Sequence, residues 1–229
     1  MEQDTEPGRE LAGSRYPVDI VGQLESYAML LQNQGVMWGL IGPREIPRIW
    51  SRHLLNCAAV ADVSEGLVPE SSSVVDVGSG AGLPGIVWSL VRPDIHVTLV
   101  EPLQRRVKFL DLAVASLDVA HRVKVVRARA EDAAGTLTAD VVTARAVAPM
   151  PKLVPWLAPF VGPSGTMIAI KGSSAADELL RSRTILDRAG FGEARVAICG
   201  RSWLNPPTTV IVAYRQQEGR QGGSSRRGS

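Results

Sequence analysis

The sequence predicts an α/β protein with a doubly wound, mostly parallel sheet, preceded by an N-terminal extension made of helices. Two observations support this prediction. From Ser71 onwards, short β-branched runs alternate with windows of helical periodicity, which is typical of a parallel sheet with helices on both faces. Before Ser71 the apolar residues recur at spacings of three and four, as in amphipathic helices. The 229 residues suffice for one such domain with an extension, but not for two full domains.

Composition divides the chain into four segments. Residues 1–15 are polar and acidic, and residues 215–229 are rich in Gly, Ser and Arg. Neither segment has the apolar content to offset the entropy of ordering, so we expect both to be disordered. The helical extension is expected over 16–70 and the sheet domain over 71–214. The chain begins without the apolar core of a signal peptide, and no apolar run approaches the ~20 residues of a membrane helix. These features predict a cytoplasmic protein.

Two helices are expected in the extension, over 18–35 and 47–66. Each window ends in glycine, a common residue just past a helix end, and the second begins with proline, which is favoured in a first turn. In the second helix Arg48 and Arg52 lie one turn apart beside His53, so their side chains share a face. That face is either a solvated basic surface or a surface for phosphate groups.

Strands and helices alternate through the rest of the chain, except at its end. The last two strands have no evident helix between them and are expected to form an antiparallel hairpin at the sheet edge. The expected strands are 74–77, 96–100, 123–127, 140–144, 166–170, 194–198 and 208–214, and the expected helices are 83–91, 104–117, 150–160 and 175–189.

The loop after the first expected strand, within "VVDVGSGAGLPG", has glycine at every second position. Glycine allows positive φ and lets the backbone approach a ligand closely. The stretch contains Gly80-x-Gly82-x-x-Gly85, the dinucleotide fingerprint, which places a pyrophosphate on a helix N-terminus. The same letters contain Asp76-x-Gly78-x-Gly80-x-Gly82, the loop of methyltransferases that use S-adenosylmethionine. The motif alone leaves both ligands open.

The remainder of the chain favours the second reading. Glu101 ends the next expected strand and suits an acid that holds ribose hydroxyls in either case. A dehydrogenase would need a second domain for its substrate, whereas everything after Gly85 here completes one sheet. Seven strands with an antiparallel last strand are the Rossmann-like architecture of class I methyltransferases. An NAD-type oxidoreductase is the alternative.

Six stretches of the chain resemble one family, the glucose-inhibited division protein B family. They are "RHLLNCA", "DVGSGAGLPGIVWSL", "VTLVEPLQRRVKFL", "RARAED", "TARAVAPMPKLVPW" and "GTMIAIKG", in the family's order. The resemblance runs from about Ile20 to Tyr214 and departs at Pro102, where the family more often has Ser, and at Ala128, where Gly is common. It implies an S-adenosylmethionine-dependent enzyme that methylates N7 of a specific guanine in 16S ribosomal RNA. A non-catalytic cofactor-binding ribosome assembly factor is a further alternative.

The resemblance also implies a cofactor site at the carboxyl ends of the strands. Asp76 is expected to accept hydrogen bonds from the cofactor's ammonium group, directly or through water, and Glu101 from its ribose. Ala130 and Glu131 are expected beside the adenine, and Arg145 beside the transferred methyl group as the catalytic residue. The full cofactor-binding set is Asp76, Gly78, Gly80, Gly82, Leu83, Glu101, Ala130, Glu131 and Arg145.

The substrate surface has to be inferred from where the charges lie, because the net charge of +2 does not indicate nucleic acid. We expect 16S rRNA in the small ribosomal subunit to contact basic residues around the cleft. These are Arg48, Arg52, His53, Arg105, Arg106, Arg127, Arg129 and Lys171. Cys57 and Cys199 lie far apart with no CxxC or His-rich partner, so we expect no metal. We further expect a monomer with no membrane contact.

The implied chemistry explains why the sequence shows no evident general base. Guanine N7 carries an in-plane lone pair and no proton, so it needs no general base to attack a sulfonium methyl group. The sequence offers no convincing nucleophile–base pair. Catalysis would therefore come from alignment of the reacting atoms.

Overall fold

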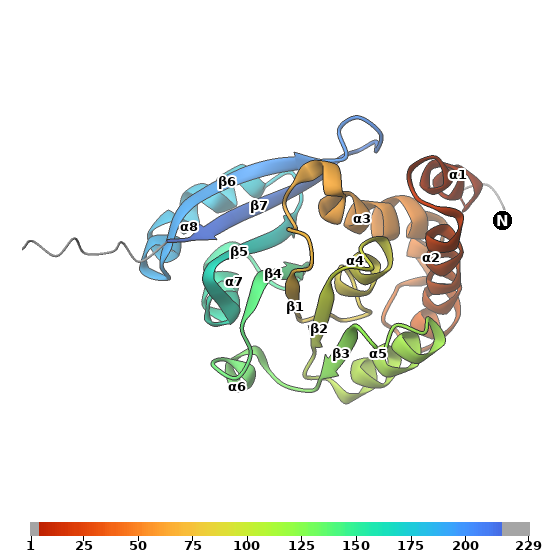
Figure 1. Ribbon diagram of the computed structural model, residues 1–229, viewed down its shortest axis with the longest axis horizontal. Coiled ribbons are helices and arrows are strands. Elements are labelled where there is room, and N and C mark those ends of the chain that lie inside the picture. The colour runs from red at the N-terminus through yellow and green to blue at the C-terminus, as the bar shows by residue number, and fades with distance from the viewer. Residues whose placement is uncertain (1–4, 217–229) are drawn as a thin grey trace, which may run out of the picture.

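The computed structural model describes residues 5–216, whose strands form one seven-stranded sheet in the order β3-β2-β1-β4-β5-β7-β6 (Figure 1). Neighbours from β3 to β5 pair in parallel, and β7 lies antiparallel between β5 and β6. The predicted doubly wound sheet with a closing hairpin is confirmed. The strands are β1 (Ser73–Val77), β2 (His96–Val100), β3 (Val123–Val126), β4 (Ala139–Arg145), β5 (Val161–Lys171), β6 (Phe191–Cys199) and β7 (Thr208–Arg215).

Strand β5 is the strand whose predicted start is furthest from the observed one. It begins at Val161 and not at Thr166, because Ala139 of β4 already pairs with Val161 before a bulge shifts the register. The segment between them, Gly-Pro-Ser-Gly, has the composition of a turn. Local composition therefore indicated a loop where the pairing of β4 extends the strand.

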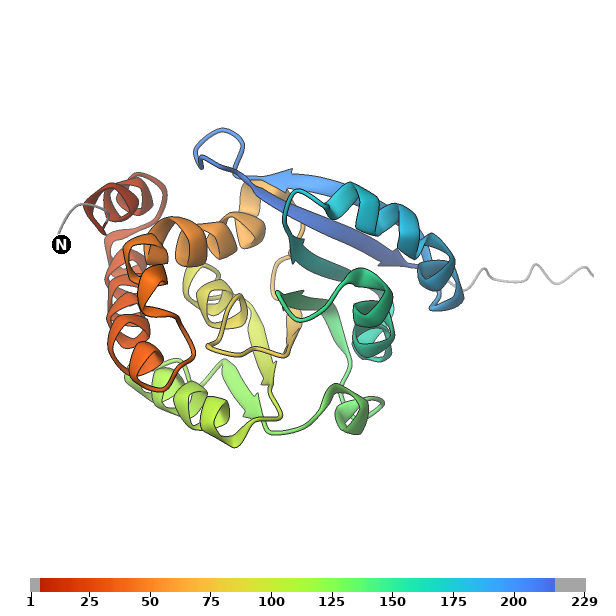
Figure 2. The ribbon, with the colours of Figure 1, turned by 180° about the vertical axis from the view of Figure 1, so that it is seen from behind.

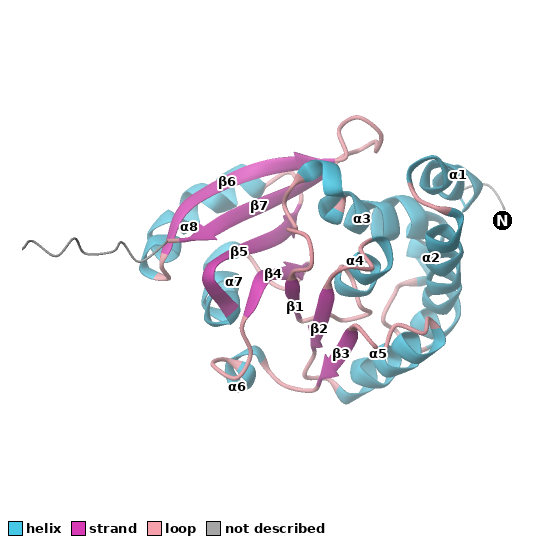
Figure 3. Cartoon of the chain, viewed as in Figure 1, coloured by secondary structure: helices cyan, strands magenta, loops and turns pink. Residues whose placement is uncertain are grey.

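The helices form two layers, one on each face of the sheet (Figures 1, 2 and 3). Successive strand residues alternate between the two layers: Val74 belongs to the core cluster under the extension, and Val75 to the cluster under α7 and α8. The α-helices are α1 (Thr5–Arg15), α2 (Val18–Leu30), α3 (Asn56–Ala61), α4 (Gly85–Val91), α5 (Gln104–Ser116), α6 (Ala130–Ala133), α7 (Met150–Leu157) and α8 (Ala175–Arg188). None of the described helices is long and apolar enough to cross a membrane.

Helix α1 corrects the expectation that residues 1–15 are disordered. Gly8 lies directly on Trp50, with no room for a side chain between them, and Ala12 is fully buried. Arg15 donates from Nε and Nη2 to the two carboxylate oxygens of Asp62, at 2.6 and 2.5 Å. Because the buried contacts use small residues, the segment has no apolar stripe in its sequence. Residues 1–4 lie outside the described part of the chain.

The predicted end of the sheet domain, at residue 214, lies one residue too early. Arg215 is the last residue of β7, and the Gln216 amide donates to the carbonyl of Gly190 at 2.9 Å. The expected disorder of the remaining tail concerns residues 217–229, which lie outside the described residues.

The second predicted helix of the extension is helical but not a single α-helix. The chain passes from a 3₁₀ helix (η2, Pro43–Arg48) through a π-helix (η3, Ile49–Leu55) into α3. Pro47, inside the 3₁₀ stretch, cannot donate a backbone hydrogen bond. A shorter π-helix (η1, Leu31–Gly35) follows α2 in the same way. Short π segments are rare and often occur at functional sites, and η3 carries His53.

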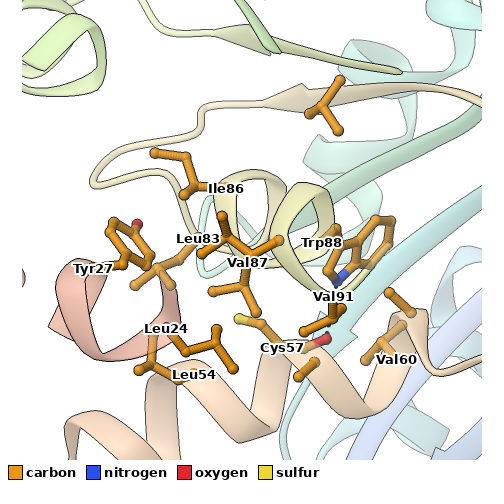
Figure 4. Packing of buried hydrophobic residues seen from close by; sticks show 14 of the residues in the cluster. Leu24, Tyr27, Leu54, Cys57, Val60, Leu83, Ile86, Val87, Trp88 and Val91 are labelled. Atoms are coloured by element: carbon orange, nitrogen blue, oxygen red, sulfur yellow. Dashed lines mark hydrogen bonds between the residues drawn. The ribbon is translucent and has the colours of Figure 1, made fainter. Parts of the chain in front are cut away.

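Helix α4 joins the extension to the sheet. All of its residues are buried, between β1 and β2 on one side and α2 and α3 on the other. Figure 4 shows Leu24, Leu54 and Cys57 of the extension facing Val87 and its neighbours. The indole of Trp88 donates to the Cys57 carbonyl at 3.0 Å. The boundary at residue 70 therefore separates two segments of the chain that share one core.

Candidate active site

A cleft of about 690 Å³ opens at the carboxyl ends of β1, β2 and β4. The strand order reverses between β1 and β4, and ligands of open α/β sheets bind at such switch points. The volume is typical of a small-molecule site. Its lining residues are Leu40, Ile41, Val77, Gly78, Ser79, Gly80, Ala81, Leu83, Val100, Glu101, Pro102, Leu103, Arg106, Ala128, Arg129, Ala130, Glu131, Arg145, Ala146, Val147 and Trp156.

Two glycines of the loop are packed tightly against side chains, whereas a third has room beside it. Gly78 has a φ of +72°, and a Cβ there would lie 2.9 Å from the Val147 side chain. Gly82 has a φ of +90°, and a Cβ there would lie 2.4 Å from Ile86. A Cβ on Gly80, in contrast, would meet only the Gly78 carbonyl at 3.8 Å. Gly78 and Gly80 line the cleft, whereas Gly82 lies behind it.

Glu101 is buried at the end of β2 with its carboxylate at the cleft. Its Oε2 accepts from the Gly80 amide and its Oε1 from the Leu103 amide, both at 3.0 Å. Arg106 Nη1 lies 3.5 Å from Oε2. A carboxylate has about four acceptor positions, so two remain for ligand hydroxyls. This fits the ribose-binding role that the resemblance implied.

Asp76, which we expected to accept from the cofactor's ammonium group directly or through water, lies behind the loop and outside the cleft lining. Its side chain is fully buried, and Oδ2 accepts from the Gly85 amide at 3.0 Å. A Cβ on Gly85 would lie 2.8 Å from that oxygen, so only glycine allows this approach. Oδ1 has no protein partner among the described residues. Burial raises the pKa of Asp76 to about 7, against the lowering effects of the Gly85 hydrogen bond and of Arg145.

Arg145 projects from the end of β4 into the edge of the cleft and contacts the extension. Its Nη2 lies 2.6 Å from His53 Nδ1, and its Nη1 donates to the Arg52 carbonyl at 3.2 Å. On the other side of the ring, His53 Nε2 lies 2.9 Å from Glu45 Oε2. A guanidinium can only donate, so Nδ1 is the acceptor and the ring proton resides on Nε2. Burial and then Arg145 lower the pKa of His53, so the ring is neutral.

His53 therefore does not belong to the expected RNA surface. The residue is 7% exposed, and both ring nitrogens have protein partners. Lys171 is also corrected: its Nζ lies 2.8 Å from the Ala148 carbonyl and 2.9 Å from Glu178 Oε2. It ties the loop after β4 to α8 and lies outside the cleft lining. In both cases a partner on another element takes up the polar group.

The remaining basic residues of the expected RNA surface lie either in the cleft lining or at the protein surface. Arg106 and Arg129 line the cleft, and Arg48, Arg52, Arg105 and Arg127 are exposed. Arg52 Nη1 lies 3.3 Å from Glu45. Within residues 5–216, Arg48, Arg105, Arg127 and Arg129 have no carboxylate within 4.0 Å.

Several residues at the site were not anticipated. Leu40 and Ile41, from the segment that joins η1 to η2, line the cleft, and so does Trp156 of α7. Tyr27 of α2 donates to the Ala81 carbonyl and so holds the glycine loop from behind. Glu45 orients His53. These residues lie on other elements than the motifs, so no spacing in the sequence marks them.

Other potentially reactive groups are enclosed. Cys57 and Cys199 are both buried and free, and burial raises their thiol pKa values to about 11 and about 12. No cluster of three or more His, Cys, Asp and Glu side chains that could bind a metal occurs in the part of the chain that the structure describes.

Comparison with known proteins identifies the family. Residues 20–203 match the family model described as GidB: rRNA small subunit methyltransferase G. The chain belongs to this family. The resemblance seen in the sequence is thus confirmed, and the ambiguous glycine loop is that of a methyltransferase.

Relatives in the GidB family match along nearly the whole chain. The Ribosomal RNA small subunit methyltransferase G of Salinispora tropica is 52% identical over 215 residues, covering 91% of this chain and 85% of the relative. The protein of that name from Rhodococcus jostii is 48% identical over 218 residues, covering 93% and 90%.

Solved structures show the same class I methyltransferase fold. A putative S-adenosylmethionine-dependent methyltransferase from Methanococcus maripaludis has a TM-score of 0.56 at 12% identity, covering 76% of this chain and 92% of that one. Fibrillarin from Aeropyrum pernix, solved with S-adenosylmethionine bound, has a TM-score of 0.52 at 17% identity, covering 69% and 76%. The predicted fold class is confirmed.

Proposed function

We propose that this GidB-family chain transfers the methyl group of S-adenosylmethionine to N7 of a guanine in 16S ribosomal RNA. The observation that carries this proposal is the family match over residues 20–203. The cleft at the carboxyl ends of β1, β2 and β4 supports it, because it places the family's motif residues around one cavity. The enzyme acts as a monomer on the small ribosomal subunit in the cytoplasm.

The cleft residues fit the cofactor in three parts. Glu101 accepts from the ribose hydroxyls through its two free acceptor positions. Ala130 and Glu131, at the start of α6, bind the adenine edge. The open space beside Gly80 takes the methionine portion. Asp76 and Gly82 support this loop from behind, and Leu83 lines the cleft just before α4.

Alignment is the main catalytic contribution of this chain. When bound, S-adenosylmethionine supplies a methyl group on a positively charged sulfur. Guanine N7 has a lone pair and no proton, so no residue of the chain has to act as a general base. The rigid cleft must hold the reacting atoms within near-attack distance. We assign Arg145, at the cleft edge between β4 and η3, as the catalytic residue that contacts the reacting groups.

The RNA surface combines the extension with the sheet loops. Arg106 and Arg129 lie at the cleft itself, and the exposed Arg48, Arg52, Arg105 and Arg127 are available for phosphates around it. Base contacts inside the cleft then select the guanine, while the phosphate contacts position the RNA.

Label transfer tests the proposed function directly. The purified protein is incubated with S-adenosylmethionine labelled in its methyl group and with small subunits from a strain that lacks this enzyme. We expect label on a 16S rRNA guanine at N7, identified by nuclease digestion and mass spectrometry. Binding of cofactor and subunits without transfer would support the assembly factor instead. Calorimetry with NAD provides a second check, since NAD binding without S-adenosylmethionine binding would support the oxidoreductase.

A substitution at Glu101 tests how the cofactor is held. Glu101→Gln keeps the size of the side chain but removes the charge and turns one acceptor into a donor that faces a backbone amide. We expect cofactor affinity to fall about 10- to 100-fold, in line with the loss of charge-assisted hydrogen bonds. The control is Glu193→Gln, an exposed acid on β6. Equal cofactor affinity of the two variants by calorimetry would contradict the assignment.

A further inference from the structure

We propose that Glu45 and His53 are positioning residues that hold Arg145 at the cleft, so that the helical extension takes part in methyl transfer as well as in RNA contact. The proposal rests on the proposed function of the cleft. Three elements meet here: η2 supplies Glu45, η3 supplies His53, and β4 supplies Arg145. Two contacts connect them, at 2.9 Å between Glu45 and His53 and at 2.6 Å between His53 and Arg145.

The hydrogen bonds along this chain of groups have only one consistent direction. Arg145 donates to Nδ1, so Nε2 carries the proton and donates to the Glu45 carboxylate. That hydrogen bond, followed by the effect of Arg52, lowers the pKa of Glu45 despite its desolvation. Glu45 thereby fixes the tautomer of the ring, and the ring presents a lone pair to the guanidinium. A neutral imidazole links an anion to a cation and holds both in place.

The arrangement leaves the charge of Arg145 available to a ligand. Among the described residues, no carboxylate lies within 4.0 Å of its guanidinium. The groups that hold it are the neutral His53 ring and the Arg52 backbone carbonyl. Arg145 is only partly buried, so its charge does not require an acid for compensation. The guanidinium of Arg145 is thus held in one orientation, but no acid neutralises its charge. This suits a residue that acts on groups inside the cleft.

Protonation of His53 would break this arrangement, because a proton on Nδ1 would face the guanidinium of Arg145. The charged groups around the ring are Glu45 on η2, Arg52 on η3 and Arg145 on β4. Burial and Arg145 lower the pKa of His53, Glu45 raises it, and Arg52 lowers it. Removal of Arg145 should therefore raise this pKa, and removal of the Glu45 charge should lower it further.

A titration by nuclear magnetic resonance tests the contacts without any activity measurement. The chain has three histidines, so the ¹⁵N signals of the rings are few and can be assigned with His96→Asn and an analogous His121 variant. We expect wild-type His53 to be protonated at Nε2 and to titrate below its ordinary value. In Arg145→Ala its pKa should rise, and in Glu45→Gln it should fall. A wild-type His53 ring protonated at Nδ1, or a pKa that neither substitution moves, would overturn the proposal.

Two substitutions of His53 separate its two bonds in the methyl-transfer assay. His53→Asn keeps an acceptor near the Nδ1 position, facing Arg145, and loses the contact with Glu45. His53→Gln keeps a donor near the Nε2 position, facing Glu45, and loses the acceptor for Arg145. We expect His53→Gln to lower kcat about 10- to 100-fold, because small misplacements at a reacting centre have effects of that size. His53→Asn should lose only about threefold, with cofactor affinity unchanged in both variants.

A double-mutant cycle shows whether His53 acts through Arg145. If it does, His53→Gln should cause no further loss of kcat in an Arg145→Ala background. His96→Asn, an exposed histidine at the opposite end of β2 from the cleft, serves as control. If the two substitutions lower kcat independently, so that their effects multiply, the positioning role is contradicted. It is also contradicted if the losses of kcat only follow the melting temperatures of the variants. A change in KM for RNA with kcat unchanged would instead place His53 on the RNA surface. If the wild-type protein transfers no methyl group, the proposed function fails, and the titration alone decides the positioning role.

Discussion

At the scale of single residues, the polar groups near the cleft divide into those that face it and those that support it. Glu101 has backbone amides on both carboxylate oxygens and still reaches the cleft. Asp76, two residues before the first glycine of the loop, accepts from the Gly85 amide with Oδ2 and leaves Oδ1 without a protein partner among the described residues. An unpaired carboxylate oxygen at full burial is costly when ionised, so the protonation state of Asp76 is linked to folding.

Asp76→Asn should change the pH dependence of stability. The folded-state pKa of about 7 lies above the ordinary value of 3.8, so the native state retains a proton that the unfolded state has lost, and wild-type stability falls as pH rises between those values. Asn mimics the neutral acid and does not titrate. We expect the melting temperature of the variant, relative to wild type, to be higher at pH 8 than at pH 5 by roughly 3–6 °C. Calorimetric scans at both pH values measure this, and a constant difference would show that Asp76 does not titrate in this range.

At the scale of elements, α1 and α4 show how the extension is attached. Helix α4 is enclosed by α2, α3 and the sheet, and the Trp88–Cys57 hydrogen bond ties it to the extension. Helix α1 contacts η3 and α2, and its contacts include Gly8 on Trp50 and the ion pair of Arg15 with Asp62. Because η3 carries His53, α1 stabilises the segment that holds Arg145.

Removal of the Arg15 side chain tests this attachment. Arg15→Ala leaves the Asp62 carboxylate, whose side chain is 5% exposed, without its bidentate partner. We expect the free energy of unfolding to fall by about 1–3 kcal/mol, the range for an unsatisfied buried polar group. Arg181→Ala, an exposed arginine of α8, should change it by less than about 0.5 kcal/mol. Urea unfolding of both variants measures the difference, and equal values would mean that the ion pair adds nothing to stability.

At the scale of the whole molecule, the cleft lies between the extension and the sheet. Leu40 and Ile41 cover it from the extension, the glycine loop and Glu101 form the sheet side, and Arg145 connects the two. Arg106 and Arg129 of the sheet domain line this opening, and Arg52 of the extension contacts Arg145 at its edge. Helix α8 covers the other face of the sheet (Figure 2). We therefore expect RNA to approach from the side of the extension.

The double variant Arg48→Ala/Arg52→Ala tests that orientation. Loss of two phosphate contacts should weaken RNA binding and reduce the slope of log K against log salt by about 1–2, because fewer counterions are released. Cofactor affinity should not change, because neither residue lines the cleft. Arg181→Ala/Arg183→Ala on α8 removes the same charge from the opposite face and should leave the slope unchanged. Titrations with RNA across a salt series would reject the orientation if the two double variants behaved alike.

The sequence by itself determined the fold class and the family, and most of the residues that it assigned to the cofactor line one cleft. Strand β2 has its predicted bounds, and the closing hairpin of β6 and β7 was recognisable because no helical window separates the two strands. Gly78, Gly80 and Glu101 were found because a ligand loop at the end of a parallel strand needs a local pattern of glycines and an acid at a fixed distance. Features that depend on near neighbours in the chain leave a periodicity or a motif.

The tertiary structure alone decided which polar groups are free to act. His53 and Lys171 read as basic residues near the cleft, but Glu45, Arg145, Ala148 and Glu178 take up their polar atoms. Helix α1 gave no apolar signal because its buried contacts are made by Gly8 and Ala12, whose partner Trp50 is distant in the sequence. A hydrogen bond or a close backbone contact depends on where two distant segments meet in space. Composition and spacing within one segment therefore do not reveal such contacts.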